Sequence, residues 1–171
     1  MLSGRGGKIM KKFVSILMIM TLCICCMACG NKNGGNSSAS IEGELTDIMA
    51  EIYAGANVDA ETKEAMQGYV SQEINADNEE YILGATGLPY TEGICSMPAM
   101  SSIAYQCVLL RVNPEDVESV KATLLENADV NKWVCVTAET VLVENVGDLV
   151  LFIMSSEDVA YAVSSSFQAL K

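Results

Sequence analysis

Hydrophobic residues follow two different patterns along this chain. Near the N-terminus, residues 13–28 form an uncharged run in which only Ser15, Thr21 and the cysteines interrupt the apolar side chains. From residue 41 onwards, apolar positions are spaced with the periods of helices and strands. Between them, residues 30–40 (GNKNGGNSSAS) carry no apolar side chain larger than alanine and cannot bury a core. The patterns therefore divide the chain into a leader, a flexible linker and a folded part.

The first half of the folded part predicts helices. Apolar residues recur at i, i+4, i+7, i+8 and i+11 from Ile41, so we expect a helix over Ile41–Tyr53 that stops at Gly55. A weaker apolar stripe predicts a second helix over residues 59–72. The segments that follow are expected to be an acidic loop at 73–80, a short strand at Tyr81–Leu83 and a glycine-rich loop at 84–93.

The second half predicts the order β-α-β-β-α. The expected elements are a strand over 103–112, a helix capped by Asn113 that ends at Asn127 with Leu125 in its buried stripe, strand segments at 133–136 and 140–144, a turn at 145–148, a strand over 149–154 and a helix from Ser155. The strand 149–154 is apolar at every position, which indicates cover on both faces. We expect the two C-terminal helices to cover one face and the N-terminal helix the other. The fold class is thus α+β, with a small, antiparallel-rich sheet.

The uncharged run is typical of a lipoprotein signal peptide. Lys11 and Lys12 precede its 16 residues, whereas a spanning helix needs about 20. The run leads into Cys26-Met27-Ala28-Cys29-Gly30, which resembles the lipobox read by bacterial lipoprotein-processing enzymes. This resemblance implies that residues 1–28 are removed and that Cys29 becomes the first residue, with a diacylglyceryl group on its sulfur. The alternative is an uncleaved transmembrane helix. We also expect translation to start at Met10.

Such an anchor implies a location, and the negative charge of the remaining chain excludes some partners. Two acyl chains anchor a protein stably, so we expect the domain 41–171 on the extracytoplasmic face of the cell membrane. Removal of residues 1–28 leaves 143 residues, enough for one domain. These carry 6 Lys+Arg against 22 Asp+Glu, a formal charge of −16. An acidic surface of this kind repels nucleic acid and anionic headgroups, which leaves envelope proteins or glycans as partners.

The residue types limit the chemistry. The chain has no histidine, which excludes Ser–His, Cys–His and His–metal sites. Its cysteines after Cys29 are Cys95, Cys107 and Cys135, without a C-x-x-C pair. We expect Cys107 and Cys135 to be buried thiols; a Cys107–Cys135 disulfide is the alternative. The acidic loop lacks EF-hand spacing, so it predicts no metal site. No cofactor motif is found in the sequence either.

Three blocks of sequence resemble a known family. They are residues 96–102 (SMPAMSS), residues 127–136 (NADVNKWVCV) and residues 147–154 (GDLVLFIM). Together with the lipobox they resemble a domain-of-unknown-function family found in lipoproteins of Gram-positive bacteria, over residues 45–171. The resemblance implies a membrane-tethered α+β domain outside the cytoplasm, and it brings no catalytic residues with it.

Two functions fit these observations best. The first is a non-catalytic binding or interaction module at the cell surface. The second is a small glycan hydrolase, which needs two carboxylates about 5–9.5 Å apart in a cleft. Its candidates are Glu73, Glu79, Glu92 and Glu139. A third, redox function would use the three cysteines of the domain.

Overall fold

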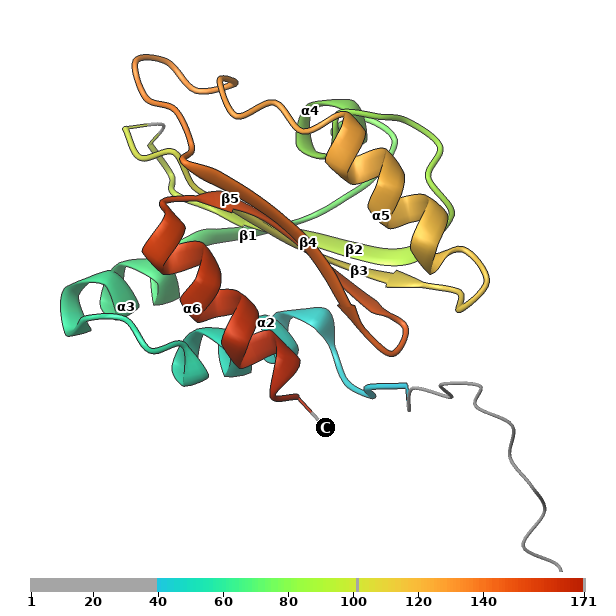
Figure 1. The fold of residues 1–171 in the computed structure, drawn as a ribbon, viewed down its shortest axis with the longest axis horizontal. Coiled ribbons are helices and arrows are strands. Elements are labelled where there is room, and N and C mark those ends of the chain that lie inside the picture. The colour runs from blue at the N-terminus through green and yellow to red at the C-terminus, as the bar shows by residue number, and fades with distance from the viewer. Residues whose placement is uncertain (1–39, 101, 171) are drawn as a thin grey trace, which may run out of the picture. The chain divides into compact units, whose positions relative to one another are not determined.

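The computed structural model describes residues 40–100 and 102–170. The leader 1–28, Cys29 and residues 30–39 of the linker lie outside the described residues. The described residues belong to one compact unit built around a five-stranded antiparallel sheet with the order β1-β2-β3-β5-β4 (Figure 1). The strands are β1 (Val70–Glu73), β2 (Tyr90–Met97), β3 (Gln106–Val112), β4 (Thr140–Val146) and β5 (Leu149–Ser155). The helices are α2 (Leu45–Gly55), α3 (Ala60–Gln67), α4 (Glu79–Leu83), α5 (Val117–Glu126) and α6 (Glu157–Gln168).

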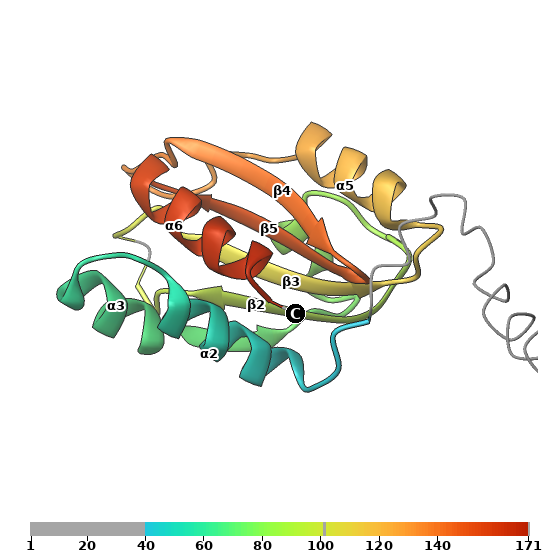
Figure 2. The ribbon, with the colours of Figure 1, turned by 60° about the horizontal axis from the view of Figure 1, so that its bottom comes forward.

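This architecture confirms the α+β class and the C-terminal β-α-β-β-α order. Every residue of β5 is buried, which confirms that this strand is covered on both faces. Its side chains alternate, so that Leu151 joins the core formed with α2 and α6, and Phe152 joins the core formed with α4 and α5. The two cores occupy opposite faces of the sheet, as Figure 2 shows for α2 and α6 against α5.

The predicted assignment of helices to faces is wrong. The C-terminal helices α5 and α6 lie on opposite faces, and α2 shares its face with α6. The reason is the chain path. Helix α5 connects β3 to β4 across one face, and α6, which follows the β4–β5 hairpin, packs against the face that α5 leaves open.

Several predicted boundaries in the N-terminal half also change. Helix α2 begins at Leu45 and ends at Gly55, because Gly43 has a positive φ of 122° and Glu44 has an extended backbone. Helix α3 ends at Gln67, before Gly68, and the predicted helix 59–72 thus includes strand β1. The predicted strand Tyr81–Leu83 is wrong: it is part of α4, which Gly84 ends in a left-handed conformation with φ of 73°.

In the C-terminal half the largest error is residues 133–136, which form no strand. Val134 is 74% exposed, and Cys135 has a φ of 68° that interrupts an extended chain. Leu125, predicted to be buried, is 60% exposed. Helix α5 begins after Asp116 instead of Asn113. The hairpin turn and the final helix lie where they are expected, within two residues.

Candidate functional site

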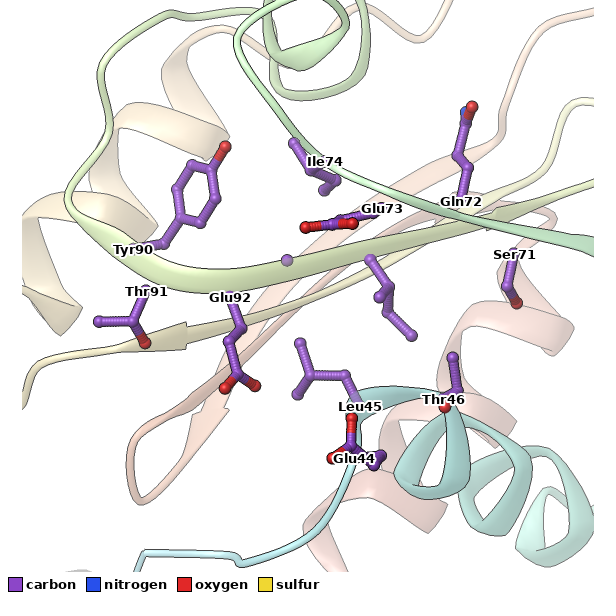
Figure 3. A pocket seen from close by; sticks show the side chains of 12 residues that line it. Glu44, Leu45, Thr46, Ser71, Gln72, Glu73, Ile74, Tyr90, Thr91 and Glu92 are labelled. Carbon is purple, nitrogen blue, oxygen red and sulfur yellow. The ribbon is translucent and has the colours of Figure 1, made fainter.

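A groove opens between the start of α2 and the strands β1 and β2 (Figure 3). Its volume is ≈ 380 Å³. The first turn of α2 forms one wall, β1 forms the other, and the start of β2, most of which extends beyond β1, forms the floor. The residues that line it are Glu44, Leu45, Thr46, Ser71, Gln72, Glu73, Ile74, Tyr90, Thr91, Glu92, Gly93 and Ile94.

The strand pattern decides which side chains face the groove. Ser71 pairs with Ser96 and Glu73 pairs with Ile94, whose side chain belongs to the core beneath α2. The alternation of the strand therefore places Ser71 and Glu73 on the α2 face and Gln72 on the other. Figure 3 shows Ser71 pointing toward α2 and Gln72 pointing away from it. The floor contains Gly93, where a Cβ would lie 2.8 Å from Cδ2 of Leu110. A Cβ there would also meet Ile74 and Tyr90, which like Leu110 belong to the core on the face opposite α2, so the glycine leaves room for the packing of that face.

Three carboxylates from three elements surround this groove: Glu44 before α2, Glu73 on β1 and Glu92 on β2. All three are exposed. Glu92 lies 3.4 Å from Nε of Arg111, an ion pair whose glutamate side chain is 57% exposed. The guanidinium also donates to the carbonyl oxygens of Ile41 (2.7 Å) and Gly43 (2.9 Å). Arg111 is thus engaged mainly outside the groove.

Other cations of the domain do not neutralise the groove. Among residues 40–170 only Lys63, Arg111, Lys121 and Lys132 are basic, against 22 acidic residues. Each of the three lysines donates to an atom elsewhere in the domain: Lys63 to Ala54 O, Lys121 to Glu118 and Asn145, and Lys132 to Tyr81 O and Gln106. The groove therefore presents a negative potential to solvent.

A second cavity, of ≈ 220 Å³, continues the groove along α2. It shares Thr46 and Ser71 with the first and is lined otherwise by uncharged residues. Ser96 lies in its wall. Ser96 is 1% exposed, and within the described part of the chain its Oγ has no hydrogen-bond partner of standard geometry, although the Tyr53 hydroxyl lies nearby. A buried hydroxyl without a partner is unusual, because nearly all buried polar groups are hydrogen-bonded.

Two tyrosines lie behind this cavity. The hydroxyl groups of Tyr53 and Tyr105 share a hydrogen bond of 3.0 Å. Burial raises the pKa of both phenols well above the ordinary value, so they stay neutral at physiological pH. The cavity thus offers neutral polar groups, in contrast to the acidic groove beside it.

Of the four predicted glutamates, the structure brings two together. Glu73 and Glu92 line the same groove. Glu79 instead accepts a hydrogen bond from the backbone N–H of Gly87 at 3.0 Å, and Glu139 accepts one from the N–H of Glu157 at 3.0 Å, at the start of α6. Glu79 and Glu139 therefore hold local structure.

The cysteines differ from one another. Cys95, Cys107 and Cys135 are free thiols, so the alternative Cys107–Cys135 disulfide is not formed. Cys95 and Cys107 are buried, and burial raises the pKa of each to about 12. They lie on neighbouring strands but belong to the cores on opposite faces of the sheet. Cys135 is exposed, which corrects the prediction that it is buried.

Glu44 and Ser96 were not among the residues predicted for a site. For Ser96 a signal exists in the sequence: it is a single hydroxyl within the apolar strand segment 94–97. Glu44 gives no such signal, because an acidic residue before a helix is common. Glu44 lines the groove only because β1 and β2, which lie further along the chain, pack beside the start of α2.

The described residues include no group of three Asp, Glu or Cys side chains that could hold a metal ion. Within the same ranges, no helix combines the length and the apolar character needed to cross a bilayer. Comparisons with protein-family models, with curated proteins and with solved structures found no match.

Proposed function

We propose that this protein is a membrane-anchored extracytoplasmic lipoprotein, and that its domain binds a ligand in the groove between α2, β1 and β2 without catalysing a reaction. The observation that carries the anchoring is the position of Cys29, directly after the uncharged run and a small alanine, and directly before a polar linker. The resemblance to a Gram-positive lipoprotein family is consistent with this proposal. The proposed contact with the membrane is the diacylglyceryl group on Cys29.

The groove favours binding over catalysis. A glycan hydrolase needs a general acid that stays protonated at neutral pH, and apolar burial is the usual way to achieve this. Glu44, Glu73 and Glu92 are all exposed, and Glu92 is additionally paired with Arg111. Exposed carboxylates are suited instead to attract and hold a positively charged ligand.

Labelling with radioactive palmitate tests the anchor. We expect the wild-type protein to incorporate label and to sediment with membranes, and Cys29→Ala to lose both properties. The matched control is Cys25→Ala, which removes a thiol from the leader and should keep the label. Label retained by Cys29→Ala, or no label on the wild type, would contradict the proposal.

One observation favours the second candidate, a carboxylate-dependent glycan hydrolase: Glu73 and Glu92 line one groove. The test is release of reducing sugars from purified peptidoglycan. We expect none from the wild type. Release that disappears in Glu73→Gln and Glu92→Gln, but persists in Glu79→Gln, would establish the hydrolase and overturn the binding proposal.

A further inference from the structure

The groove lies beside a free sheet edge. Strand β1 is the outermost strand, and all four of its residues are exposed. The opposite edge, β4, is different: Glu144 is held by Ser164 and Gln168 of α6, and Asn145 by Lys121 of α5. Side chains from both helices thus flank β4, whereas β1 remains open to another chain.

The register identifies which backbone groups of β1 are free. The N–H of Ile74 donates to the carbonyl of Gly93 at 2.8 Å, which makes this a hydrogen-bonded pair. Hydrogen-bonded pairs alternate along an antiparallel ladder, so Ser71 and Glu73 direct their N–H and C=O groups away from β2. The carbonyl of Glu73 accepts from Asn78, which leaves the Ser71 N–H, the Ser71 C=O and the Glu73 N–H for a partner.

The same two residues direct their side chains into the groove. An added strand would place one side chain beside Glu73 and another, two residues away, beside Ser71. Beside Glu73 that side chain enters the groove with the three carboxylates, where a Lys or Arg is favoured. Beside the small Ser71 it enters the uncharged cavity.

Ser96 lies in the wall of this cavity, opposite Ser71 on β2. Its Oγ is about two strand spacings, roughly 10 Å, from the axis of an added strand. An extended glutamine side chain reaches about 5 Å from its Cα, so it would end above Ser71, within the uncharged cavity. The cavity therefore favours a side chain of about this length with an uncharged polar end.

From these observations we infer that β1 binds an extended basic peptide segment by strand addition, with a Lys or Arg beside Glu73 and an uncharged polar side chain, two residues away, in the cavity beside Ser71. The inference deepens the proposed function and rests on it, because it names the ligand class of the same groove. The peptide backbone supplies the pairing, and the two pockets supply specificity for the alternating residues.

The test uses the full-length mature protein in detergent micelles and the peptide acetyl-TQTKTQT-amide. This peptide presents Lys and Gln two residues apart in either strand direction. Residue-resolved amide exchange by NMR is the readout. We expect binding to slow exchange at Ser71 and Glu73 about tenfold or more, and to leave the already paired Gln72 unchanged.

Variants separate the contribution of the backbone pairing from that of the carboxylate. Ser71→Pro removes an outward N–H and should abolish binding, while Ser71→Ala keeps it and should bind. Glu73→Gln should weaken binding about two- to fivefold at low salt, and Glu51→Gln, on the exposed side of α2, should not. Circular dichroism checks that Ser71→Pro is folded; if it is not, the exchange pattern of the wild type decides.

Spermine serves as a polycation without a backbone. Peptide binding with protection at Ser71 and Glu73 supports strand addition. If spermine competes equally and those amides stay unprotected, the groove holds cations in general and strand addition is overturned. No binding of TQTKTQT also overturns it, while palmitate labelling of Cys29 tests the proposed function separately.

Discussion

Cys135 is the exposed one of the three cysteines that the structure describes, and its backbone is left-handed with φ of 68°. Cys95 and Cys107 are buried and have a pKa raised to about 12. A thiol reacts through its thiolate and must be accessible to the reagent. The three thiols should therefore differ sharply in reactivity, although their residue type is the same.

We predict that the native mature protein exposes one fast-reacting thiol to 5,5′-dithiobis(2-nitrobenzoate), and that all three react in denaturant. Cys135→Ser should remove the fast phase, whereas Cys107→Ser should leave it intact. Two or three fast thiols in the native protein would show that the sheet does not bury Cys95 and Cys107 as described.

Arg111 is the residue that fastens the beginning of the domain. It donates to the carbonyl groups of Ile41 and Gly43 and pairs with Asp148 at 3.1 Å, with the arginine side chain 17% exposed and the aspartate 14%. Asp148 in turn accepts from Oγ of Ser40 at 2.9 Å. Ser40, expected to be the last residue of a flexible linker, is thus held to the sheet.

Arg111→Ala should lower the free energy of unfolding by about 2–3 kcal/mol, because it removes the cationic partner of Asp148 and the donor to two carbonyl groups. The matched control is Lys121→Ala. The side chain of Glu118, its ion-pair partner, is 84% exposed, so we expect a loss of about 1 kcal/mol or less. Urea unfolding measures both, and equal losses would contradict the role of Arg111.

Asp148 gives this contact a pH dependence. Burial opposes its ionisation, but hydrogen bonds from Ser40, Arg111 and Ile41, together with the charge of Arg111, outweigh burial and lower the pKa of Asp148 below its ordinary value of 3.8. A lowered pKa stabilises the folded state above the ordinary value, and this stabilisation is lost as the pH falls through the folded-state pKa.

Asp148→Asn should therefore be less stable than the wild type at pH 7, and the difference should shrink as the pH falls below about 4. Glu126→Gln, at the exposed end of α5, removes a carboxylate without such hydrogen bonds and serves as the control; it should change the free energy of unfolding at pH 7 by less than Asp148→Asn. Unfolding free energies from urea titrations between pH 7 and pH 3 provide the test. A difference that stays constant over this range would contradict it.

At the level of elements, α4 meets the end of α5. A Cβ on Gly84 would collide with the carbonyl oxygen of Asn127, and Gly84 also has a positive φ of 73°. Gly87, three residues later, has a similar φ of 71° but nothing within 4 Å of a Cβ. The two glycines share the backbone conformation and differ in the space around them.

Gly84→Ala should destabilise the fold by about 2–4 kcal/mol, the sum of left-handed strain and the collision, and Gly87→Ala by about 1 kcal/mol from strain alone. The difference between their melting temperatures isolates the contact of α4 with α5. Equal losses would mean that the two helices do not approach each other this closely.

The sequence best predicts those elements in which the local pattern of apolar residues agrees with the contacts that the element makes in the fold. Strand β5 is apolar throughout and α6 has a regular stripe, and both lie where expected. Residues 133–136 are apolar too, but Lys132 donates to Tyr81 O and Gln106, which holds this segment against α4 instead of in the sheet. Such a contact cannot be seen in the local pattern.

The short elements and the site could not be predicted correctly from the sequence, because both depend on contacts between distant parts of the chain. Tyr81–Leu83 is too short for a period to separate strand from helix, and β1 follows α3 after only two residues. Glu73 and Glu92 could be proposed as a pair from residue type. Their meeting with Glu44 and Ser96 depends on the register of β1 against β2 and on the position of α2, which no local pattern encodes.

At the scale of the whole molecule, Ser40 at the start of the strongly acidic domain is hydrogen-bonded to Asp148. The first residue of the groove, Glu44, follows four residues later. In the proposed function the preceding linker joins this groove to a lipid on Cys29. A segment of 11 residues spans at most about 40 Å, so the groove would work close to the membrane. A ligand would then be captured at the cell surface and not in the cytoplasm.

The intact mass of the protein extracted from membranes tests the proposed anchoring most directly. We predict a polypeptide that spans Cys29–Lys171 and carries a diacylglyceryl adduct located on its N-terminal cysteine by fragmentation. A chain that retains residues 10–28, or one that begins elsewhere and has no lipid on Cys29, would contradict the proposal.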